Sequence, residues 1–181
     1  MKLLIASDIH GSEYWMKEVV NAFNYEKADM LLLLGDIYNH GPRNPLPQDY
    51  APMKVADILN AMTDKLMVVK GNCDSEVDQM ISKFSFVNEA MVCVNGNRIY
   101  ATHGHIFNKD NIPVNCGEAL VYGHFHVCFI ERINGIIVAN PGSVSLPKQN
   151  SPHAYLIVED NDMSLKELGT YKLIQKEKIK L

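Results

Sequence analysis

Near its start the chain reads Leu3-Leu4-Ile5-Ala6-Ser7-Asp8-Ile9-His10-Gly11, an aliphatic run that passes directly into polar residues. An uninterrupted apolar run bounded by polar residues predicts a strand over residues 2–7 that is buried on both faces. Asp8 and His10 are two positions apart, so on an extended chain their side chains leave the same face. The pair suits a transition metal, but alone it is more typical of a helix-capping Asp beside an exposed His.

The same pattern returns twice along the chain. A second aliphatic run, Met30–Leu34, is followed by Gly35-Asp36, and a third, Leu66–Val69, is followed by Lys70-Gly71-Asn72-Cys73-Asp74. Strands that alternate with helices predict a largely parallel sheet, and ligands of such sheets gather at the carboxyl ends of the strands. The intervening segments predict helices over 13–25 and 53–63.

After a short helix predicted around 75–83, the sequence becomes rich in strand signals. Asn95-Gly96-Asn97 predicts a hairpin turn, and two later strands end in His103-Gly104-His105 and Gly123-His124-Phe125-His126. We expect this half to form a second sheet that packs on the first. The predicted strands are Met91–Val94, Arg98–Thr102, Ala119–Tyr122, Val127–Ile133, Ile136–Ala139, Tyr155–Glu159 and Ser164–Thr170, followed by a charged tail.

Bulk composition predicts one globular domain that spans residues 1–181. The 181 residues are 47% hydrophobic and 21% charged, which is ordinary for a single buried core. The net charge of -4 and the absence of any Lys/Arg-rich block argue against general nucleic-acid binding and against an anionic membrane surface. A bound phosphate would therefore need some other source of positive charge.

The cysteines and the N-terminal segment predict a cytoplasmic protein with free thiols. Cys73, Cys93, Cys116 and Cys128 form no Cys-x-x-Cys pair, so a structural zinc site is not expected. The apolar run before Asp8 is too short for a signal peptide, and no stretch approaches the length of a membrane span.

Residues 37–52 contain four prolines and are predicted to form a loop at a strand end. Long loops in this position are often functional. His40 and Arg43 in this loop are candidates for binding a phosphate, since a guanidinium presents two donors in one plane. A solvated loop without such contacts is the equal alternative.

Five predicted strand ends thus carry polar ligand types in a fixed order. The ordered set resembles the signature of the calcineurin-like metallophosphoesterase superfamily and runs from Asp8 to Ser143. Segments 39–44 and 71–80 further resemble the small bacterial phosphodiesterases of YfcE type. The motifs are Asp-x-His at Asp8 and His10, Gly-Asp at Asp36, Gly-Asn-x-Asp at Asn72, His-Gly-His at His103, and Gly-His-x-His at His124 and His126.

The resemblance implies an α/β fold, a four-layer αββα sandwich of two mixed β-sheets flanked by helices, and a centre of two divalent metal ions. A carboxylate can bridge two ions through its two oxygens, and a neutral amide limits the accumulated negative charge. The resemblance assigns one ion to Asp8, His10, Asp36 and His126, and the other to Asp36, Asn72, His103 and His124.

By the same resemblance, the protein is a metal-dependent phosphodiesterase in which a hydroxide bridging the ions attacks phosphorus. We expect Mn²⁺ first, with Fe, Zn or Ni as alternatives, because affinity order alone does not decide among them. The implied catalytic residues are Asp36, Asn72, Cys73 and Asp74. His40, Arg43 and His105 are the candidate contacts of a small phosphodiester substrate. For His105 two alternatives are equally open, namely that it orients His103 or that it only hydrogen-bonds to the backbone.

Cys73 departs from the wider superfamily, many members of which have a histidine there to protonate the leaving group. A neutral thiol is a poor acid for an alkoxide, so we expect a preference for diesters with good leaving groups, helped by Asp74 or a metal-bound water. The alternatives are a non-catalytic scaffold on the same fold, as in the retromer subunit that resembles this family, and a phosphomonoesterase. Whether the chain forms a homodimer or homotetramer stays open from sequence.

Overall fold

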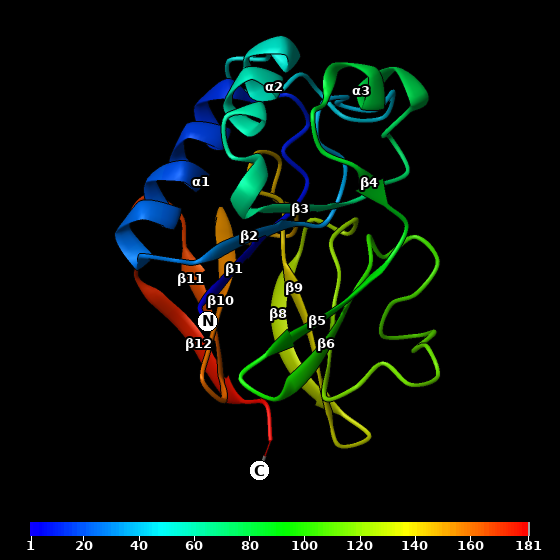
Figure 1. The fold of residues 1–181 in the computed structure, drawn as a ribbon, viewed down its shortest axis with the longest axis vertical. Helices are drawn as coiled ribbons and strands as arrows, with labels where there is room; N and C mark the ends of the chain where they lie inside the picture. The colour runs from blue at the N-terminus through cyan, green and yellow to red at the C-terminus, as the bar shows by residue number, and fades with distance from the viewer. Residues whose placement is uncertain (181) are drawn as a thin grey trace.

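The structure, a computed structural model, describes residues 1–180. Its strands form two sheets that pack face to face, and helices cover the outer face of the larger one (Figure 1). The larger sheet has the order β12-β11-β10-β1-β2-β3-β4, and the smaller sheet has the order β5-β6-β7-β9-β8. Each contains both parallel and antiparallel pairs, so the prediction of two mixed sheets with flanking helices is confirmed.

The strands β1 to β3 follow the predicted alternation of strand and helix, and with β4, which was not predicted, they run parallel to one another. The first helix begins where the Ser12 side chain accepts a hydrogen bond from the Trp15 amide, and it ends at Lys27 in a left-handed conformation. The elements are β1 (Leu3–Ala6), α1 (Glu13–Glu26), β2 (Met30–Leu33), α2 (Pro52–Asn60), the short 3-10 helix η1 (Thr63–Lys65), β3 (Leu66–Val69), α3 (Glu76–Ile81) and β4 (Phe86–Val87).

The last three strands correct one prediction. The strands at 155–159 and 164–170 were expected with the second sheet, and the residues after them as a charged tail. Instead β10 (Ala154–Glu159) pairs antiparallel with β1, and β11 (Asp162–Glu167) and β12 (Leu173–Lys178) extend the larger sheet beyond it. The charged tail is therefore largely an edge strand. A strand's pattern of apolar residues reports its burial but not its neighbour, so the sequence left this pairing undetermined.

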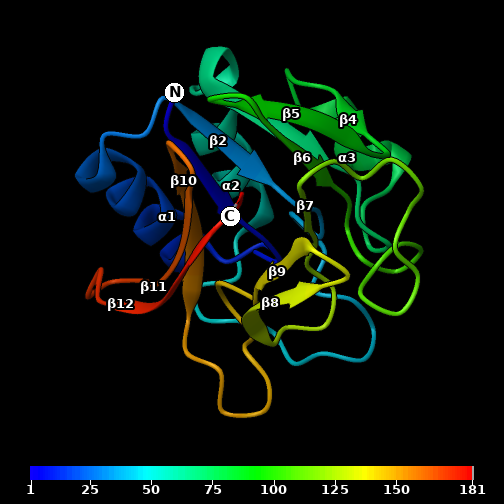
Figure 2. The same cartoon turned by 90° about the horizontal axis from the view of Figure 1, so that it is seen from below.

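The smaller sheet places three strands, β6, β7 and β9, parallel to one another. The carboxyl ends of β6 and β7 carry the histidine motifs, and they lie at the same rim of the sandwich as the ends of β1 to β3 (Figures 1 and 2). The strands are β5 (Ala90–Val94), β6 (Asn97–Ala101), β7 (Ala119–Val121), β8 (Cys128–Ile133) and β9 (Ile136–Pro141).

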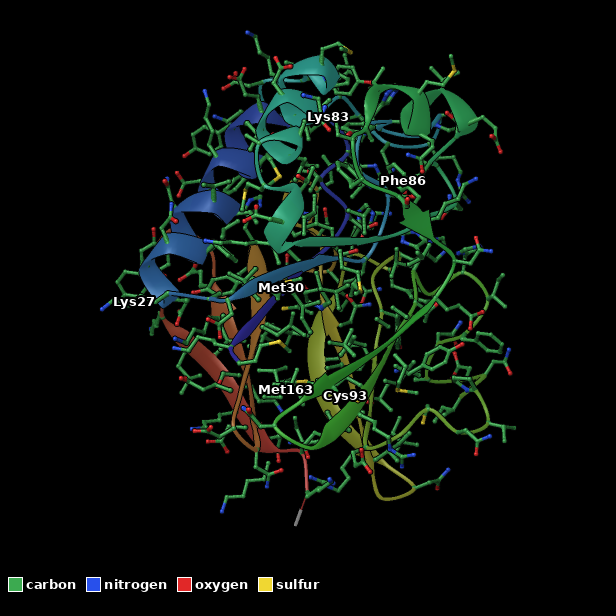
Figure 3. All side chains as sticks on the ribbon, viewed as in Figure 1. Lys27, Met30, Lys83, Phe86, Cys93 and Met163 are labelled. Atoms are coloured by element: carbon green, nitrogen blue, oxygen red, sulfur yellow. The ribbon has the colours of Figure 1, made fainter. Side chains whose placement is uncertain are left out.

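Two main apolar cores hold these layers together. One lies between α1, α2 and the larger sheet, and the other lies between the two sheets, where Met163 of β11 is fully buried (Figure 3). The strands β1 and β2 are buried on both faces, as their continuous aliphatic runs predict, because each face contributes to a different core.

The outer face of the smaller sheet differs from the expected helical fourth layer. Residues 102–118 cover it as an irregular segment, and Ile112 of this segment packs against Leu120, Tyr122 and Val138. Within residues 1–180, no helix follows α3. The same range includes no helix that combines the length and apolar character needed to cross a lipid bilayer.

Candidate metal centre

Every predicted ligand lies at one rim of the sandwich, just past a strand end. The chain after β1 continues beside the chain after β2, since the Asp8 amide donates to the Gly35 carbonyl and the His10 amide donates to the Asp36 carbonyl. On the smaller sheet, the Gly123 amide donates to the His103 carbonyl in the same manner. These backbone bonds fix the positions from which the side chains converge.

His10 and His126 meet tip to tip although 116 residues separate them. Their Nε2 atoms are 3.1 Å apart. His10 Nδ1 donates to the Asn39 carbonyl at 2.8 Å, and His126 Nδ1 donates to the Leu146 carbonyl at 2.7 Å. A carbonyl oxygen can only accept, so each ring carries its proton on Nδ1 and directs the lone pair of Nε2 toward the other ring.

This arrangement fits a cation between the two rings. Asp8 Oδ1 lies 3.3 Å from His126 Nε2 and 3.7 Å from His10 Nε2, and this oxygen is buried without a hydrogen-bond donor among the described residues. Three buried lone-pair atoms that face one another without a hydrogen-bond donor are unfavourable in free energy. A positive charge placed between them would remove this cost. Asp8, His10 and His126 have ligand atoms within 4.8 Å of one another, as a metal site requires.

His103 and Asp36 form the adjoining part of the cluster. His103 Nδ1 donates to the Leu34 carbonyl at 2.6 Å, which directs Nε2 to Asp36 Oδ1 at 3.4 Å and to Asn72 Oδ1 at 3.0 Å. Burial lowers the pKa of His103, but the hydrogen bond with Asp36 and the charges of Asp8 and Asp36 raise it to about 9. The raised pKa means that the carboxylates around His103 favour a positive charge at this position.

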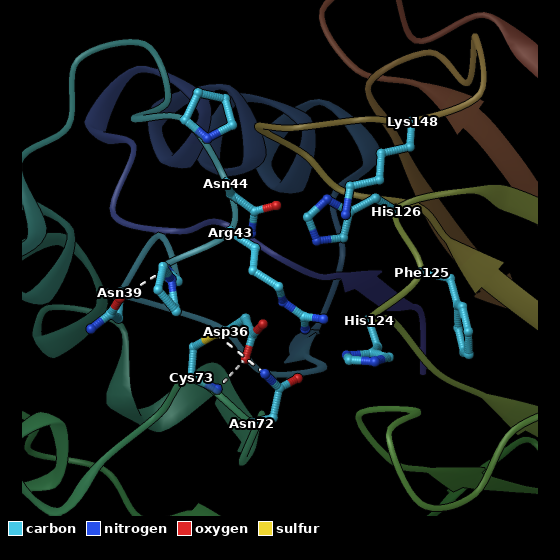
Figure 4. A pocket seen from close by; sticks show the side chains of 13 residues that line it. Asp36, Asn39, Arg43, Asn44, Asn72, Cys73, His124, Phe125, His126 and Lys148 are labelled. Atoms are coloured by element: carbon cyan, nitrogen blue, oxygen red, sulfur yellow. Dashed lines mark hydrogen bonds between the residues drawn. The ribbon is translucent and has the colours of Figure 1, made fainter.

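Asp36 lies between the two groups of histidines. Its Oδ2 is 3.9 Å from His10 Nε2, while its Oδ1 faces His103 and also accepts a hydrogen bond from the Cys73 amide at 2.8 Å (Figure 4). Burial raises the pKa of the Asp36 carboxyl, but the hydrogen bond and charge of His103 outweigh it and leave the pKa lowered. The carboxylate is therefore ionised and has one oxygen toward each group.

The pKa values of the other cluster residues are also set by burial and by neighbouring charges. Burial raises the pKa of Asp8, yet the close approach of His126 and the charge of His103 lower it overall. Burial lowers the pKa of His10 and of His124. Neutral imidazoles and ionised carboxylates are the forms that bind divalent ions.

The backbone of the cluster is held in an uncommon conformation. Five of the seven predicted ligands have positive φ angles, a region that costs about 1–3 kcal/mol for most residues and recurs at functional sites. This backbone conformation directs the ligand side chains of each motif toward the same point. The five are Asp8 (57°), His10 (52°), Asp36 (54°), His124 (68°) and His126 (61°).

Two glycines leave the space that the carboxylates occupy. A Cβ at Gly71 would overlap Asp36 Oδ1, and a Cβ at Gly123 would stand 2.5 Å from Asp8 Oδ2 and overlap the Ser7 hydroxyl. Any side chain at these positions would push the carboxylates out of the cluster, because the backbone passes directly behind them.

Asp74 supports the cluster from behind. Its Oδ2 accepts from the Asp36 amide at 2.8 Å and the Gly71 amide at 2.7 Å, while its Oδ1 accepts from the Ile37 amide at 2.8 Å. Burial raises the pKa of Asp74 to about 6 against these hydrogen bonds. Both oxygens are engaged with the backbone, so the geometry favours a positioning role over the predicted help to a leaving group.

Cys73 lies beside the cluster with its thiol protonated. Burial and the charge of Asp36 raise the pKa of Cys73 to about 12. Its sulfur accepts from Asn72 Nδ2 at 3.3 Å and lies with His10 and Asp36 in a third group whose ligand atoms are within 4.8 Å of one another. A neutral thiol here is a weak acid and a weak nucleophile.

A pocket of about 730 Å³ opens over the cluster (Figure 4). Arg43 and Lys148 reach into it from different loops, and Asp36 is the acidic side chain among its lining residues. The residues that line it are Asp36, Asn39, Gly41, Pro42, Arg43, Asn44, Pro45, Asn72, Cys73, His124, Phe125, His126 and Lys148.

Two of the three predicted substrate contacts lie elsewhere. His40 packs its ring edge-on against Tyr50, with centroids 5.4 Å apart, and it does not line the pocket. His105 is exposed, and its ring centroid is 5.5 Å from that of His103, so it stands beside the cluster but outside the lining. Of the three, the structure brings Arg43 into the pocket.

The turn after β9 fastens the second sheet to the first. Ser143 Oγ donates to the Asp8 carbonyl at 2.7 Å, Ser145 Oγ donates to the same carbonyl at 3.0 Å, and Asn140 Nδ2 donates to the Gly123 carbonyl at 2.8 Å. These residues hold the backbone of two ligand motifs and contact no ligand side chain by hydrogen bonds.

The chain matches the calcineurin-like phosphoesterase superfamily domain over residues 1–163. It is 44% identical over 176 residues to Phosphodiesterase YfcE of Escherichia coli K12, which covers 96% of each chain. The chain belongs to the calcineurin-like phosphoesterase superfamily. The predicted family is thus confirmed, and membership implies divalent metal ions at a cluster of this kind.

Other known proteins resemble the chain to different degrees. The solved structure of the E. coli phosphoesterase Yfce superimposes with a TM-score of 0.94 at 42% identity, and the match covers 99% of this chain and 100% of that one. Probable metallophosphoesterase YsnB of Bacillus subtilis is 28% identical over 90% of this chain and 86% of its own. Vacuolar Protein Sorting 29 of Cryptosporidium parvum, at 17% identity and a TM-score of 0.66 over 98% of this chain and 97% of that one, shares the fold.

Outside the predicted loop over residues 37–52, sequence reasoning missed two residues of the pocket, Phe125 and Lys148. Phe125 stands between two predicted ligands, so its position in the Gly-His-x-His motif could have drawn attention to it. Lys148 belongs to a loop with no motif, and its place depends on the bonds that this loop makes to His126. No sequence pattern signals such a contact.

Proposed function

We propose that the protein is a metal-dependent phosphodiesterase of the cytoplasm that acts on small phosphodiesters, built as one domain over residues 1–181. The observation that carries the proposal is the pair of facing lone pairs on His10 and His126, beside the unpartnered Asp8 oxygen. The 44% identity to a protein named as a phosphodiesterase supports the reaction type. The net charge of -4 supports small substrates over general nucleic-acid binding.

Two divalent ions would divide the cluster between them. The donors grouped around Asp8 would hold one ion, the donors grouped around Asn72 would hold the other, and Asp36 would bridge the pair, since each of its oxygens faces one group. The first set is Asp8, His10, Asp36 and His126, and the second is Asp36, Asn72, His103 and His124.

The bound ions would supply positive charge for the phosphoryl oxygens and a hydrolytic water with a pKa lowered toward neutrality. We propose Mn²⁺ as the native metal, with Fe, Zn or Ni able to occupy the same mixture of carboxylate, amide and imidazole donors. Oxygen and nitrogen donors fit all of these ions, whereas a site built from thiolates would favour softer ones.

The chain's own residues position the phosphate and the carboxylates. Arg43 enters the pocket and can donate two parallel hydrogen bonds to the non-bridging oxygens of the substrate phosphate. Asp74 keeps the Asp36 backbone in place through its three amide contacts. Both roles orient groups without making or breaking a bond.

The leaving group receives little acid assistance from the protein. The Cys73 thiol, with a pKa of about 12, is a weak proton donor, and Asp74 is directed to backbone amides away from the pocket. We therefore propose that diesters with acidic leaving groups are hydrolysed fastest.

The test is to strip the protein of metal, supply Mn²⁺, and compare bis-p-nitrophenyl phosphate with p-nitrophenyl phosphate. We expect faster turnover of the diester, and no turnover when a chelator is present. Faster turnover of the monoester would make the protein a phosphomonoesterase. Retention of Mn²⁺ without turnover of either compound would support the scaffold alternative.

A further inference from the structure

Two cations reach into the pocket without an acidic partner. Arg43 and Lys148 come from opposite walls and both extend toward the space above Asp36 and His126 (Figure 4). Neither forms a salt bridge with any residue in 1–180. Both side chains are exposed to solvent, so the observation that matters is that the two cations converge over one pocket, an arrangement that suits an anion.

The loops that carry these cations are fastened to the two facing histidines. The Asn39 carbonyl, on the Arg43 loop, accepts from His10 Nδ1, and the Leu146 carbonyl, on the Lys148 loop, accepts from His126 Nδ1. The Lys148 amide in turn donates to the His126 carbonyl at 2.9 Å. Both cations therefore originate from backbone positions that are fixed relative to the metal centre.

The positive charge of Arg43, Lys148 and the proposed metal ions is more than is needed to neutralise a simple phosphodiester. A diester carries one negative charge, and the proposed pair of divalent ions already outweighs Asp8 and Asp36. Arg43 accounts for one further contact to the scissile phosphate, which leaves Lys148 without an anion to bind. The pocket of about 730 Å³ also has room for a substrate much larger than a dialkyl phosphate.

We propose that Lys148 binds a second anionic group of the substrate, so that the preferred substrate is a phosphodiester that carries a further phosphate. Phe125, 46% exposed in the same pocket, offers a flat apolar wall for the organic part that joins the two phosphates. This inference rests on the proposed phosphodiesterase activity and names the substrate class of the same site.

The test uses two chromogenic diesters with the same scissile bond and leaving group. One is the p-nitrophenyl ester of thymidine 5′-phosphate, and the other is the same ester with an added 3′-phosphate. We expect the Mn²⁺-loaded protein to prefer the 3′-phosphorylated ester by about tenfold in kcat/KM, the value of one charge-assisted contact. Lys148→Met should bring this preference close to one. Lys54→Met, which removes an exposed lysine of α2, should leave it unchanged.

A binding measurement separates recognition from turnover. By calorimetry, thymidine 3′,5′-bisphosphate should bind the wild-type protein about tenfold more tightly than thymidine 5′-phosphate, and Lys148→Met should remove the difference. Equal treatment of both esters by the wild type would overturn the proposal, as would a Lys148→Met variant that retains the preference. If bis-p-nitrophenyl phosphate is hydrolysed in either case, the proposed function survives this failure.

Discussion

The two halves of the metal centre are built differently. In one half, Asp8, His10 and His126 are 0–2% exposed, and both imidazoles are oriented by backbone carbonyls. In the other half, Asn72 is exposed, and the His124 ring has no hydrogen-bond partner within residues 1–180. His103 of this second half is as buried and as firmly oriented as the ligands of the first, through the Leu34 carbonyl. The first half is thus organised before an ion binds, whereas the second still has Asn72 and His124 to order.

This difference predicts unequal affinities for the two ions. A site whose ligands are already fixed loses little conformational entropy on binding, while a site with mobile ligands must order them first. The exposed half also contributes more to the substrate pocket, since Asn72 and His124 line it, against His126 alone of the buried half. We therefore expect a tightly held ion in the buried half and a more exchangeable ion beside the substrate.

Asp36→Asn should break both halves together and have the largest effect. The amide cannot place an anionic oxygen toward each group of histidines, so we expect loss of bound Mn²⁺ and a fall in diester hydrolysis of roughly a thousandfold. Metal analysis and the bis-p-nitrophenyl phosphate assay measure the two effects, and Asp64→Asn, an exposed acid of η1, serves as the control. Full hydrolysis by the Asp36 variant would rule out the bridging role.

His10→Ala and His124→Ala should distinguish the halves. Loss of the fixed His10 ligand should weaken the tighter Mn²⁺ site by about 100-fold, and loss of the unanchored His124 should weaken the other site by about tenfold. Isothermal titration of Mn²⁺ into each metal-stripped variant measures both affinities, with urea unfolding to check that each is folded. Equal losses at the same site would show that the two halves are not distinct.

Gly71→Ala should disturb the connection between the halves without removing a ligand. The new Cβ would overlap Asp36 Oδ1, and we expect a loss of about 2 kcal/mol in the free energy of unfolding together with weaker Mn²⁺ binding. Gly96→Ala is the control, because nothing lies within 4 Å of a Cβ there and only its positive φ opposes the change. Urea unfolding of the two variants compares them, and normal Mn²⁺ binding by the Gly71 variant would argue against the close approach.

Cys73→His should produce the smallest change, confined to the exposed half. A histidine could donate a proton to the leaving group, so we expect about tenfold faster hydrolysis of diesters with weakly acidic leaving groups and little change for p-nitrophenyl esters. Rates across a series of substituted phenyl diesters give the dependence on leaving-group pKa, with Cys73→Ser as the control. An unchanged dependence would remove the argument from the missing acid.

The halves also differ in how far the sequence predicts them. Asp8, His10 and Asp36 follow aliphatic strands that alternate with helices, so their convergence follows from the rules of parallel sheets. The contact between His10 and His126 joins two sheets across 116 residues, and only the family resemblance indicated it. The local sequence pattern around each histidine does not indicate that the two side chains meet.

The other features that the sequence did not predict share one physical cause, because each depends on hydrogen bonds to backbone atoms. The carbonyls of Asn39 and Leu146 orient the histidines, and a carbonyl belongs to every residue type, so no sequence signal marks these two. In the same way β10 joins β1 through ladder bonds that any extended segment can make. The two residues of β4 are too few to show a strand pattern.

The most direct test of a two-ion centre with unequal halves is a Mn²⁺ titration of the metal-stripped wild-type protein, followed by calorimetry. We expect two equivalents to bind in two steps that differ in affinity by about tenfold or more, because one set of ligands is fixed in advance and the other is not. Binding of a single equivalent, or of two with the same affinity, would contradict the proposed centre.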